Sequence, residues 1–364
     1  LILNEVQMNK LLLLSLLLSA SVFAEVWDAD NDPRKFDQNF EYKLNALPLK
    51  AVLPLSKTPW SNSYWPRMKG GINYRWNTPN PIGNELNSPS RSRVQSMSWQ
   101  QLSQLSPAEK FDLAQGQYDY PLSTRVEKQY KKNAKDYEGL CDGWTASAIQ
   151  FPEPAPVDIT NPDGIVIPFG SSDVKALMSY DVSINFQPGA MKSVFIGSYC
   201  GFGIGMGSAK CSDINPGAFH VVLANQIALK QESFAADIEA KKETWNQPVY
   251  GYEFEILGKT TAEGAAQAYI VHAKMMYAED DPDGEEYKHI FNWNPVVGTV
   301  NFMGAVQELD YILELDYAGN IIGGSWLGES KRNHPDLFWK PTKKIQFTSG
   351  FSFLNKIYKP FFVE

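Results

Sequence analysis

The sequence has 364 residues, of which 43% are hydrophobic and 13% aromatic, and its formal net charge is −8 at pH 7. This composition is typical of a globular chain with a sizeable core, folded as one large domain or two moderate ones. The negative charge excludes a nucleic-acid partner, because phosphate binding needs clustered Lys and Arg, and the basic stretch 128–135 is typical of the solvated face of a helix.

The N-terminus predicts export. From Met8 the chain reads MNKLLLLSLLLSASVFAE, in which a leucine-rich run too short to span a bilayer comfortably is followed by the small-x-small pattern of residues 22–24. We expect residues 1–24 to be a signal peptide, with artefact residues ahead of Met8, and the mature protein to be secreted without stable membrane insertion. An uncleaved membrane anchor is the alternative.

Residues 25–95 are rich in Pro, Asn, Ser and Trp and have neither helical nor strand period, as in PWSNSYWPRMKGGINYRW. We expect an irregular layer anchored by aromatic side chains, or a propeptide that covers a cleft until it is cleaved. The main domain then spans residues 96–364.

Helices are predicted in the first half of this domain. LSPAEKFDLAQG has Ser106 as N-cap, Pro107 in the first turn and Glu109 completing a capping box. The stretch STRVEKQYKKNAKDYEG predicts a helix that ends at Gly139, DGWTASAIQ one that starts at Cys141, and SSDVKALMSY another.

Strands are predicted in the second half. FHVVLANQIAL, VYGYEFEIL, AYIVHAKMMYA, VGTVNFMGAVQELDYILELD and NIIGGSWLG are β-branched or aromatic runs separated by turn residues. Helices early and strands late predict an α+β fold whose second half is largely an antiparallel sheet.

The three cysteines divide into a pair and a single residue. Cys200 and Cys211 flank the glycine-rich loop CGFGIGMGSAKC, which lets their sulfur atoms meet, so we expect a disulfide bond between them and a free Cys141; three separate buried thiols are the alternative. A free thiol in an oxidising compartment is a hazard, which suggests that Cys141 has a use.

Cys141 is a candidate nucleophile because the positive end of a helix favours a thiolate, although a buried structural cysteine fits the local sequence equally well. His220 follows a Pro-Gly turn at the predicted start of an apolar strand and is its candidate proton-transfer partner; a core histidine is the alternative. Asn246 and Asp213 compete to orient the imidazole, with Asn225 a weaker candidate, and Gln247 or a glutamine nearer Cys141 is a candidate oxyanion donor.

Several motifs together resemble the transglutaminase elicitor family, secreted transglutaminases that carry a WNQPV elicitor peptide. TWNQPVYGYEFEI resembles the elicitor peptide, GLCDGWTASA the nucleophile region, CSDINPGAFHVVLAN the histidine region, and PWSNSYWP and LELDYAGNIIGGSWLGESKRNHPDLFW the two terminal signatures. The resemblance extends from about residue 59 to about residue 340. One departure is Tyr250, where the elicitor peptide has a basic residue.

The resemblance implies a calcium-dependent protein-glutamine γ-glutamyltransferase with a papain-like cysteine-protease core and protein substrates that expose glutamine and lysine. Cys141 would form a thioester with a glutamine side chain, and His220 would protonate the departing ammonia. A lysine amine would then complete an isopeptide crosslink, with water as a competitor. The third member of the site stays open between Asn246 and Asp213.

The calcium site is less visible in the sequence. The acidic turns DADNDP, at residues 28–33, and EDDPDGEE, which holds Asp281, Asp283 and Glu285, offer carboxylate oxygens, but neither has the spacing of an EF-hand loop. We expect Asp281, Asp283 and Glu285 to be the metal ligands.

Two other functions fit parts of the pattern. A papain-like peptidase or amidase would use the same cysteine and histidine with water as the acceptor. A secreted binding protein would instead use the aromatic residues Trp60, Tyr64 and Trp65 as an interface. His334, in the C-terminal signature, is predicted to be structural.

Overall fold

The computed structural model describes residues 26–76, 87–135, 137–185, 193–198, 213–238, 244–280 and 302–361. The helices are α2 (Arg91–Ser96), α3 (Trp99–Ser103), α4 (Pro107–Ala114), α5 (Pro121–Glu127), α6 (Cys141–Gln150), α7 (Ser171–Asn185), α8 (Pro216–Leu223) and α9 (Leu354–Ile357), and a π-helix (Ala224–Lys230) continues α8. The strands are β1 (Lys50–Val52), β2 (Val157–Thr160), β3 (Val166–Phe169), β4 (Ser193–Gly197), β5 (Phe234–Asp237), β6 (Asn246–Thr260), β7 (Gln267–Ala278), β8 (Gly304–Leu315), β9 (Ile321–Trp326) and β10 (Leu337–Pro341).

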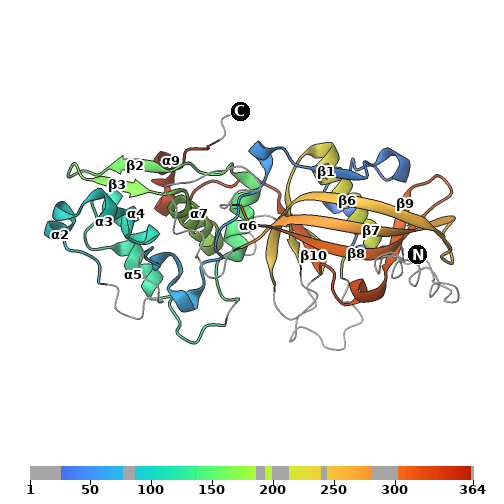
Figure 1. Ribbon diagram of the computed structural model, residues 1–364, viewed down its shortest axis with the longest axis horizontal. Helices are drawn as coiled ribbons and strands as arrows, with labels where there is room; N and C mark the ends of the chain where they lie inside the picture. The colour runs from blue at the N-terminus through green and yellow to red at the C-terminus, as the bar shows by residue number, and fades with distance from the viewer. Residues whose placement is uncertain are drawn as a thin grey trace, which may run out of the picture.

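Two lobes lie side by side, with α6 where they meet (Figure 1). The helical lobe holds α2 to α5, α7, α9 and the β2–β3 hairpin, and the sheet lobe holds the remaining strands with α8 and the π-helix. Helix and antiparallel sheet are therefore both present as predicted, while the papain-like core stays a prediction. Within the described ranges, no helix has the length and apolar character needed to cross a membrane.

The sheet is antiparallel throughout, in the order β4-β10-β5-β6-β7-β8-β9, and β1 pairs with β6. Strand β6 is its longest element, and its first residue, Asn246, pairs with Asp237 of β5. Because a strand advances about 3.3 Å per residue, the two ends of β6 lie tens of ångströms apart. Its start faces the helical lobe, since α6 packs against β5 and β6.

Buried charges hold the helical lobe together. Lys110 of α4 and Asp173 of α7 form an ion pair of 2.7 Å in which both side chains are fully buried. Asp173 also accepts hydrogen bonds from Trp76 Nε1 and from the Gly170 backbone. Burial of two charges is tolerable here because both oxygens of Asp173 accept hydrogen bonds. These directed contacts fix how α4 and α7 pack.

The N-terminal layer, described for residues 26–76, belongs to both hydrophobic cores. Phe36 and Phe40 are buried in the core of the sheet lobe, and Trp60 and Trp65 in that of the helical lobe. Over these residues the layer has short 3-10 turns and one short strand, and α2 begins within the range 25–95 that was expected to be irregular. Removing it would open both cores, which weighs against the propeptide hypothesis.

The chain returns to the helical lobe near its end. After β10, Phe351, Leu354 and Ile357 enter the core of the helical lobe, where the Phe351 ring lies 5.2 Å from that of Phe111. Asp181 of α7 accepts hydrogen bonds from the backbone and hydroxyl of Thr348. The core formed mainly by the first half of the sequence is thus completed by its last described residues.

The predicted strand at FHVVLANQIAL is wrong, because these residues form α8 and the π-helix. Asn215 is the N-cap, its side chain accepting from the Gly217 N–H, and Pro216 occupies the first turn. This helix is buried on all sides and has no polar face. Its sequence is therefore a continuous apolar run, a pattern that is also typical of a buried strand.

The helix predicted to continue to Gly139 is also wrong, since α5 ends at Glu127. The capping box at Ser106 and Glu109 is confirmed, and so are the helices beginning at Cys141 and in SSDVKALMSY. The last four predicted strands correspond to β6, β7, β8 and β9, the start of the β8 prediction lying outside the described residues.

Candidate functional site

Cys141 is the first residue of α6, and it lies where the two lobes meet. The helix begins there because the preceding Leu140 N–H donates to the Tyr64 carbonyl, at 2.6 Å, instead of to a helical partner. Gly139 makes this approach possible, since a Cβ at that position would lie 2.4 Å from the Tyr64 carbonyl oxygen. The thiol is thus held at a helix N-terminus against the N-terminal layer.

Asn246 presents its amide to the sulfur. Trp339 Nε1 donates to Asn246 Oδ1 at 2.7 Å, and because an indole N–H can only donate, the oxygen of the amide must face the tryptophan. The Nδ2 group is then directed at Cys141 Sγ, 3.9 Å away. Thr145 fixes the backbone of the same residue by donating to its carbonyl at 2.8 Å.

Two carboxylates act on the thiol electrostatically. Burial raises the pKa of Cys141 to about 12; Asp142 and Asp280 act in the same direction, against the lowering effect of the Asn246 N–H. Asp142 accepts a hydrogen bond from Ser183, and burial raises the pKa of its carboxyl. The resting site therefore holds a neutral thiol, contrary to the thiolate expected from the helix N-terminus.

Gln247 lies beside Asn246 on β6, and its Nε2 donates to Asp280 Oδ1 at 2.7 Å. One of the two N–H donors of its amide is therefore engaged, and the oxyanion role predicted for Gln247 stays a prediction. Its Oε1 is buried without a hydrogen-bond partner among the described residues.

Asn62 is a residue that the sequence reasoning missed. It lies midway along a segment that crosses the first turn of α6, because the Trp60 carbonyl accepts from Trp144 Nε1 and the Tyr64 carbonyl from Leu140. It also forms a parallel bridge with Asp280. Its side chain is fully buried, and neither Oδ1 nor Nδ2 has a hydrogen-bond partner within the described part of the chain.

His220 is not brought to Cys141. It lies on α8, fully buried, with Nδ1 2.8 Å from the Tyr311 hydroxyl and its ring stacked on Phe254 at 3.8 Å. Phe254 is eight residues along β6 from Asn246, which corresponds to roughly 26 Å of strand. The predicted pairing of His220 with Cys141 therefore has no support in this geometry, and the alternative of a core histidine describes it better.

Asp213 also makes its contacts in the sheet lobe. Its Oδ2 lies 3.3 Å from His334 Nε2, and its carbonyl accepts from Asn31 Nδ2. His334 is stacked on Trp326 and bonded to the Ser330 carbonyl, an arrangement that fits its predicted structural role. Of the two residues proposed as third member of the site, Asn246 is the one placed at Cys141.

The predicted metal and disulfide residues cannot be compared with the structure. Asp281, Asp283, Glu285, Cys200 and Cys211 lie outside the described residues. Among the residues that are described, no cluster of three or more His, Cys, Asp or Glu side chains has the arrangement of a metal site.

The acidic turn at residues 28–33 does not fit a calcium ion as it is folded. Asp32 pairs with Arg34, Asp30 lies 3.4 Å from Lys35, and Asp28 accepts backbone N–H groups. Its carboxylates are thus used within the turn, and calcium binding elsewhere stays a prediction.

These features define an α+β protein of two lobes with a half-buried, free cysteine at the start of the helix between them. The chain belongs to the Transglutaminase elicitor family, which it matches over residues 32–353. It is similar in fold to the GP42 transglutaminase from Phytophthora sojae, with a TM-score of 0.65 and 22% sequence identity over 92% of this chain and 98% of that chain. A search of curated proteins finds no match.

Proposed function

We propose that the protein is an exported protein-glutamine γ-glutamyltransferase whose nucleophile is Cys141. The observation that carries the proposal is the geometry of that thiol: it opens α6, faces a side-chain amide with a fixed orientation, and lies in a chain that belongs to the Transglutaminase elicitor family. The predicted leader supports export, and the family supports proteins as substrates.

The reaction has two steps. Cys141 Sγ attacks the carboxamide carbon of a glutamine side chain, a C–S bond forms, the C–N bond breaks, and ammonia leaves with the thiol proton. A lysine amine then attacks the thioester carbon, which restores the thiol and leaves an isopeptide bond. With water in place of the amine, the product is a glutamate side chain.

Asn62 and Asn246 have separate roles in this proposal. Asn246 Nδ2 already donates to the sulfur, so it holds the thiol in place and stabilises the thiolate as the proton leaves. The Asn62 amide is buried beside the first turn of α6 and has no partner among the described residues, so it is available for an oxygen that becomes negative only during the reaction. Such a pre-positioned donor is the usual basis of an oxyanion hole.

His220 has no part in the proposed mechanism. The three histidines that the structure describes are each held elsewhere, His220 by Tyr311, His272 by Asp310 and His334 by Ser330. Replacing each of the four histidines of the sequence in turn would identify an imidazole that transfers protons during turnover.

The test is incorporation of a fluorescent primary amine into a glutamine-rich protein by the purified mature enzyme, with and without calcium. Cys141→Ser is the inactive control and His220→Gln the matched variant from the sheet lobe. We expect labelling to fall at least 10³-fold in Cys141→Ser and to change less than threefold in His220→Gln.

Other outcomes would overturn the proposal. Release of ammonia or peptide fragments that depends on Cys141, without labelling, would indicate a hydrolase. Equal signals from the wild type and Cys141→Ser would indicate a binding protein. Calcium dependence of labelling would support the metal prediction, and equal rates in a chelator would contradict it.

A further inference from the structure

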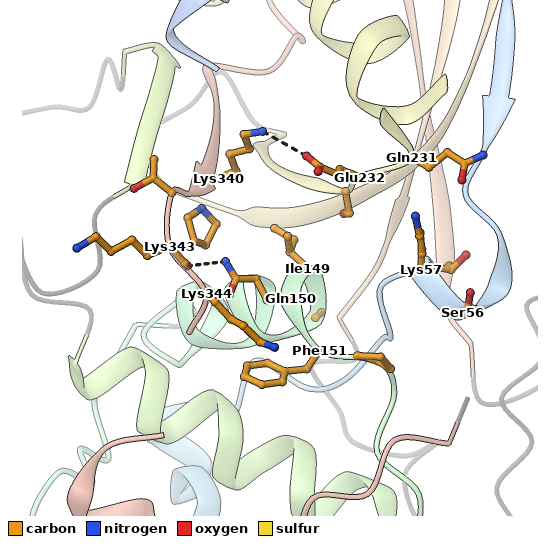
Figure 2. A pocket seen from close by; sticks show the side chains of 16 residues that line it. Ser56, Lys57, Ile149, Gln150, Phe151, Gln231, Glu232, Lys340, Lys343 and Lys344 are labelled. Atoms are coloured by element: carbon orange, nitrogen blue, oxygen red, sulfur yellow. Dashed lines mark hydrogen bonds and ion pairs between the residues drawn. The ribbon is translucent and has the colours of Figure 1, made fainter. Parts of the chain in front are cut away.

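A cavity of 520 Å³ lies at the opposite end of α6 from Cys141. Its walls come from residues 56–58, the end of α6, residues 231–233 after the π-helix, and the end of β10 with the residues that follow it. Figure 2 shows Lys340 and Glu232 at one wall, Lys344 near Phe151 at another, and Lys57 across the cavity. Nothing in the proposed mechanism uses this cavity.

The charge of this cavity is opposite to that of the protein. Four lysines line it against one carboxylate, Glu232, in a chain whose net charge is −8; the lysines are Lys57, Lys340, Lys343 and Lys344. Glu232 lies 3.5 Å from Lys340 and is itself largely exposed, so it offsets one lysine at most. The carbonyl groups at the end of α6 offset only about half a unit charge. Positive charge therefore remains for a ligand to neutralise.

The cavity is built by specific contacts. The side-chain amide of Gln150 binds the chain that follows β10 with both of its polar atoms. Its Nε2 donates to the Lys343 carbonyl at 2.8 Å, and its Oε1 accepts from the Ile345 N–H at 2.6 Å. On the other side, Gln231 ends the π-helix in a left-handed conformation, with φ 54°. Both π-helical turns and left-handed non-glycine residues are concentrated at functional sites, because the fold must hold them against their cost.

The apolar part of the lining favours a peptide over a sugar. Ile149, Phe151, Pro152 and Pro341 provide aliphatic and ring edges beside the lysines. The Phe151 ring is stacked on Phe347 at 5.2 Å and meets Tyr358 edge to face, so one of its faces is already covered. A chain with both carboxylate and apolar side chains matches this mixture.

We propose that this cavity binds an acidic peptide segment of the protein substrate; the substrate link rests on the proposed function. The nine helical steps from Cys141 to Gln150 cover about 14 Å, a distance that about four extended residues span. Aspartate or glutamate about four residues from the reactive glutamine would bind the lysines and raise the local concentration of that glutamine at the thiol.

The binding test uses the full mature chain with Cys141→Ala, so that it does not depend on turnover. The probe is a fluorescein-labelled Leu-Asp-Glu-Asp-Leu-Glu peptide, measured by anisotropy, and the pocket variant is Lys57→Glu with Lys344→Glu. Lys128→Glu with Lys132→Glu, at exposed positions of the helical lobe, is the charge-matched control. We expect at least tenfold weaker binding for the pocket variant, less than twofold for the control, and weaker binding at higher salt.

Equal weakening in both variants would overturn the proposal, since it would indicate attraction to overall charge only. Tighter binding of an oligogalacturonate of equal charge at the same lysines would also overturn it, in favour of an acidic glycan. Absence of peptide binding at millimolar concentration would do the same.

A kinetic experiment distinguishes failure of this inference from failure of the proposed function. Glutamine peptides with acidic residues four positions away should have a KM at least tenfold lower than their amide counterparts, with an unchanged kcat, and the pocket variant should lose the difference. Absence of turnover with any peptide would count against the transferase while leaving the binding result intact. Turnover without this KM difference would count against the pocket alone.

Discussion

Two regions of the molecule, around His220 and around Cys141, differ in the polar groups that surround the residue at their centre. Among the described residues, His220 has one hydrogen-bond partner, the Tyr311 hydroxyl, and aromatic rings around it, while its Nε2 is buried without a partner. Cys141 faces an amide, two carboxylates act on it, and two buried side chains nearby, Asn62 and Gln247, have amide atoms without partners among the described residues. The first arrangement leaves one ring nitrogen unsatisfied in apolar surroundings, whereas the second gathers several unsatisfied amide atoms near a thiol, which is costly unless a substrate completes it.

The comparison teaches that residue type alone does not locate the chemistry. Histidine is the commoner catalytic residue and asparagine the commoner structural one, yet here the histidine His220 is enclosed and the asparagine Asn246 faces the thiol. Each difference between the two groups predicts a measurable effect.

The largest expected effect is protection of the Cys141 thiol. With its pKa raised to about 12 from an ordinary 9.0, the thiolate fraction at pH 8 is lower by about 10³-fold, so alkylation by iodoacetamide should be slower by about that factor than alkylation of glutathione. The rate should rise about tenfold per pH unit above pH 8. Site-resolved mass spectrometry would follow Cys141 itself, and a rate equal to that of glutathione would contradict the neutral thiol.

The next effect concerns Asn62. Asn62→Leu should lower kcat by about 10² to 10³-fold while raising the free energy of unfolding by about 1–2 kcal/mol, because it removes a buried amide without partners. Asn161→Leu is the matched control, since Asn161 is equally enclosed but bonds Leu113, Asp163 and Ile165. The control should lose about 2–3 kcal/mol. Loss of stability in Asn62→Leu would show that the amide is structural.

A third effect is the pH dependence of stability contributed by His220. Burial lowers its pKa to about 3 from 6.5, so below pH 6.5 the unfolded chain takes up a proton that the native protein does not. Stability present at neutral pH is therefore lost as the pH falls, by about 2 kcal/mol between pH 6.5 and 4.5. In urea unfolding, His220→Gln should lose about 2 kcal/mol less stability than the wild type over this interval.

The smallest effect is that of the Tyr311 hydroxyl. Tyr311→Phe leaves His220 Nδ1 buried without its partner, which should lower the free energy of unfolding by about 1–3 kcal/mol. Amine incorporation below the melting temperature should stay within twofold of the wild type. A large drop in kcat with unchanged stability would place the pair in the chemistry after all and reverse the comparison.

Local signals in the sequence predicted much of the fold. The capping box at Ser106 and the helix start at Cys141 depend on neighbours in the chain, and both are confirmed. The helix at 216–223 was missed because burial on every side removes the polar face that gives helical periodicity, although Asn215 and Pro216 were a cap signal for it. A long helix after residue 127 was predicted from propensity, which gives no measure of tertiary packing.

The site was predictable where motifs were contiguous and unpredictable where they were not. Cys141 and Asn246 stood out in their own motifs. Asn62 was within a noted motif, PWSNSYWP, but only its aromatic residues drew attention. Asp280 and Trp339 act on the site through long-range sheet pairing, for which one sequence carries no signal.

The return of residues 351–357 to the helical lobe has a consequence for biosynthesis. As the chain leaves the ribosome, that lobe lacks Phe351, Leu354 and Ile357 until synthesis is nearly complete, so the earliest lobe to be translated is the last to be finished. Domains usually acquire their native packing in order of synthesis, and this topology prevents it. We therefore expect the nascent chain to complete the packing of its helical lobe, and with it the thiol site, only once it has been released.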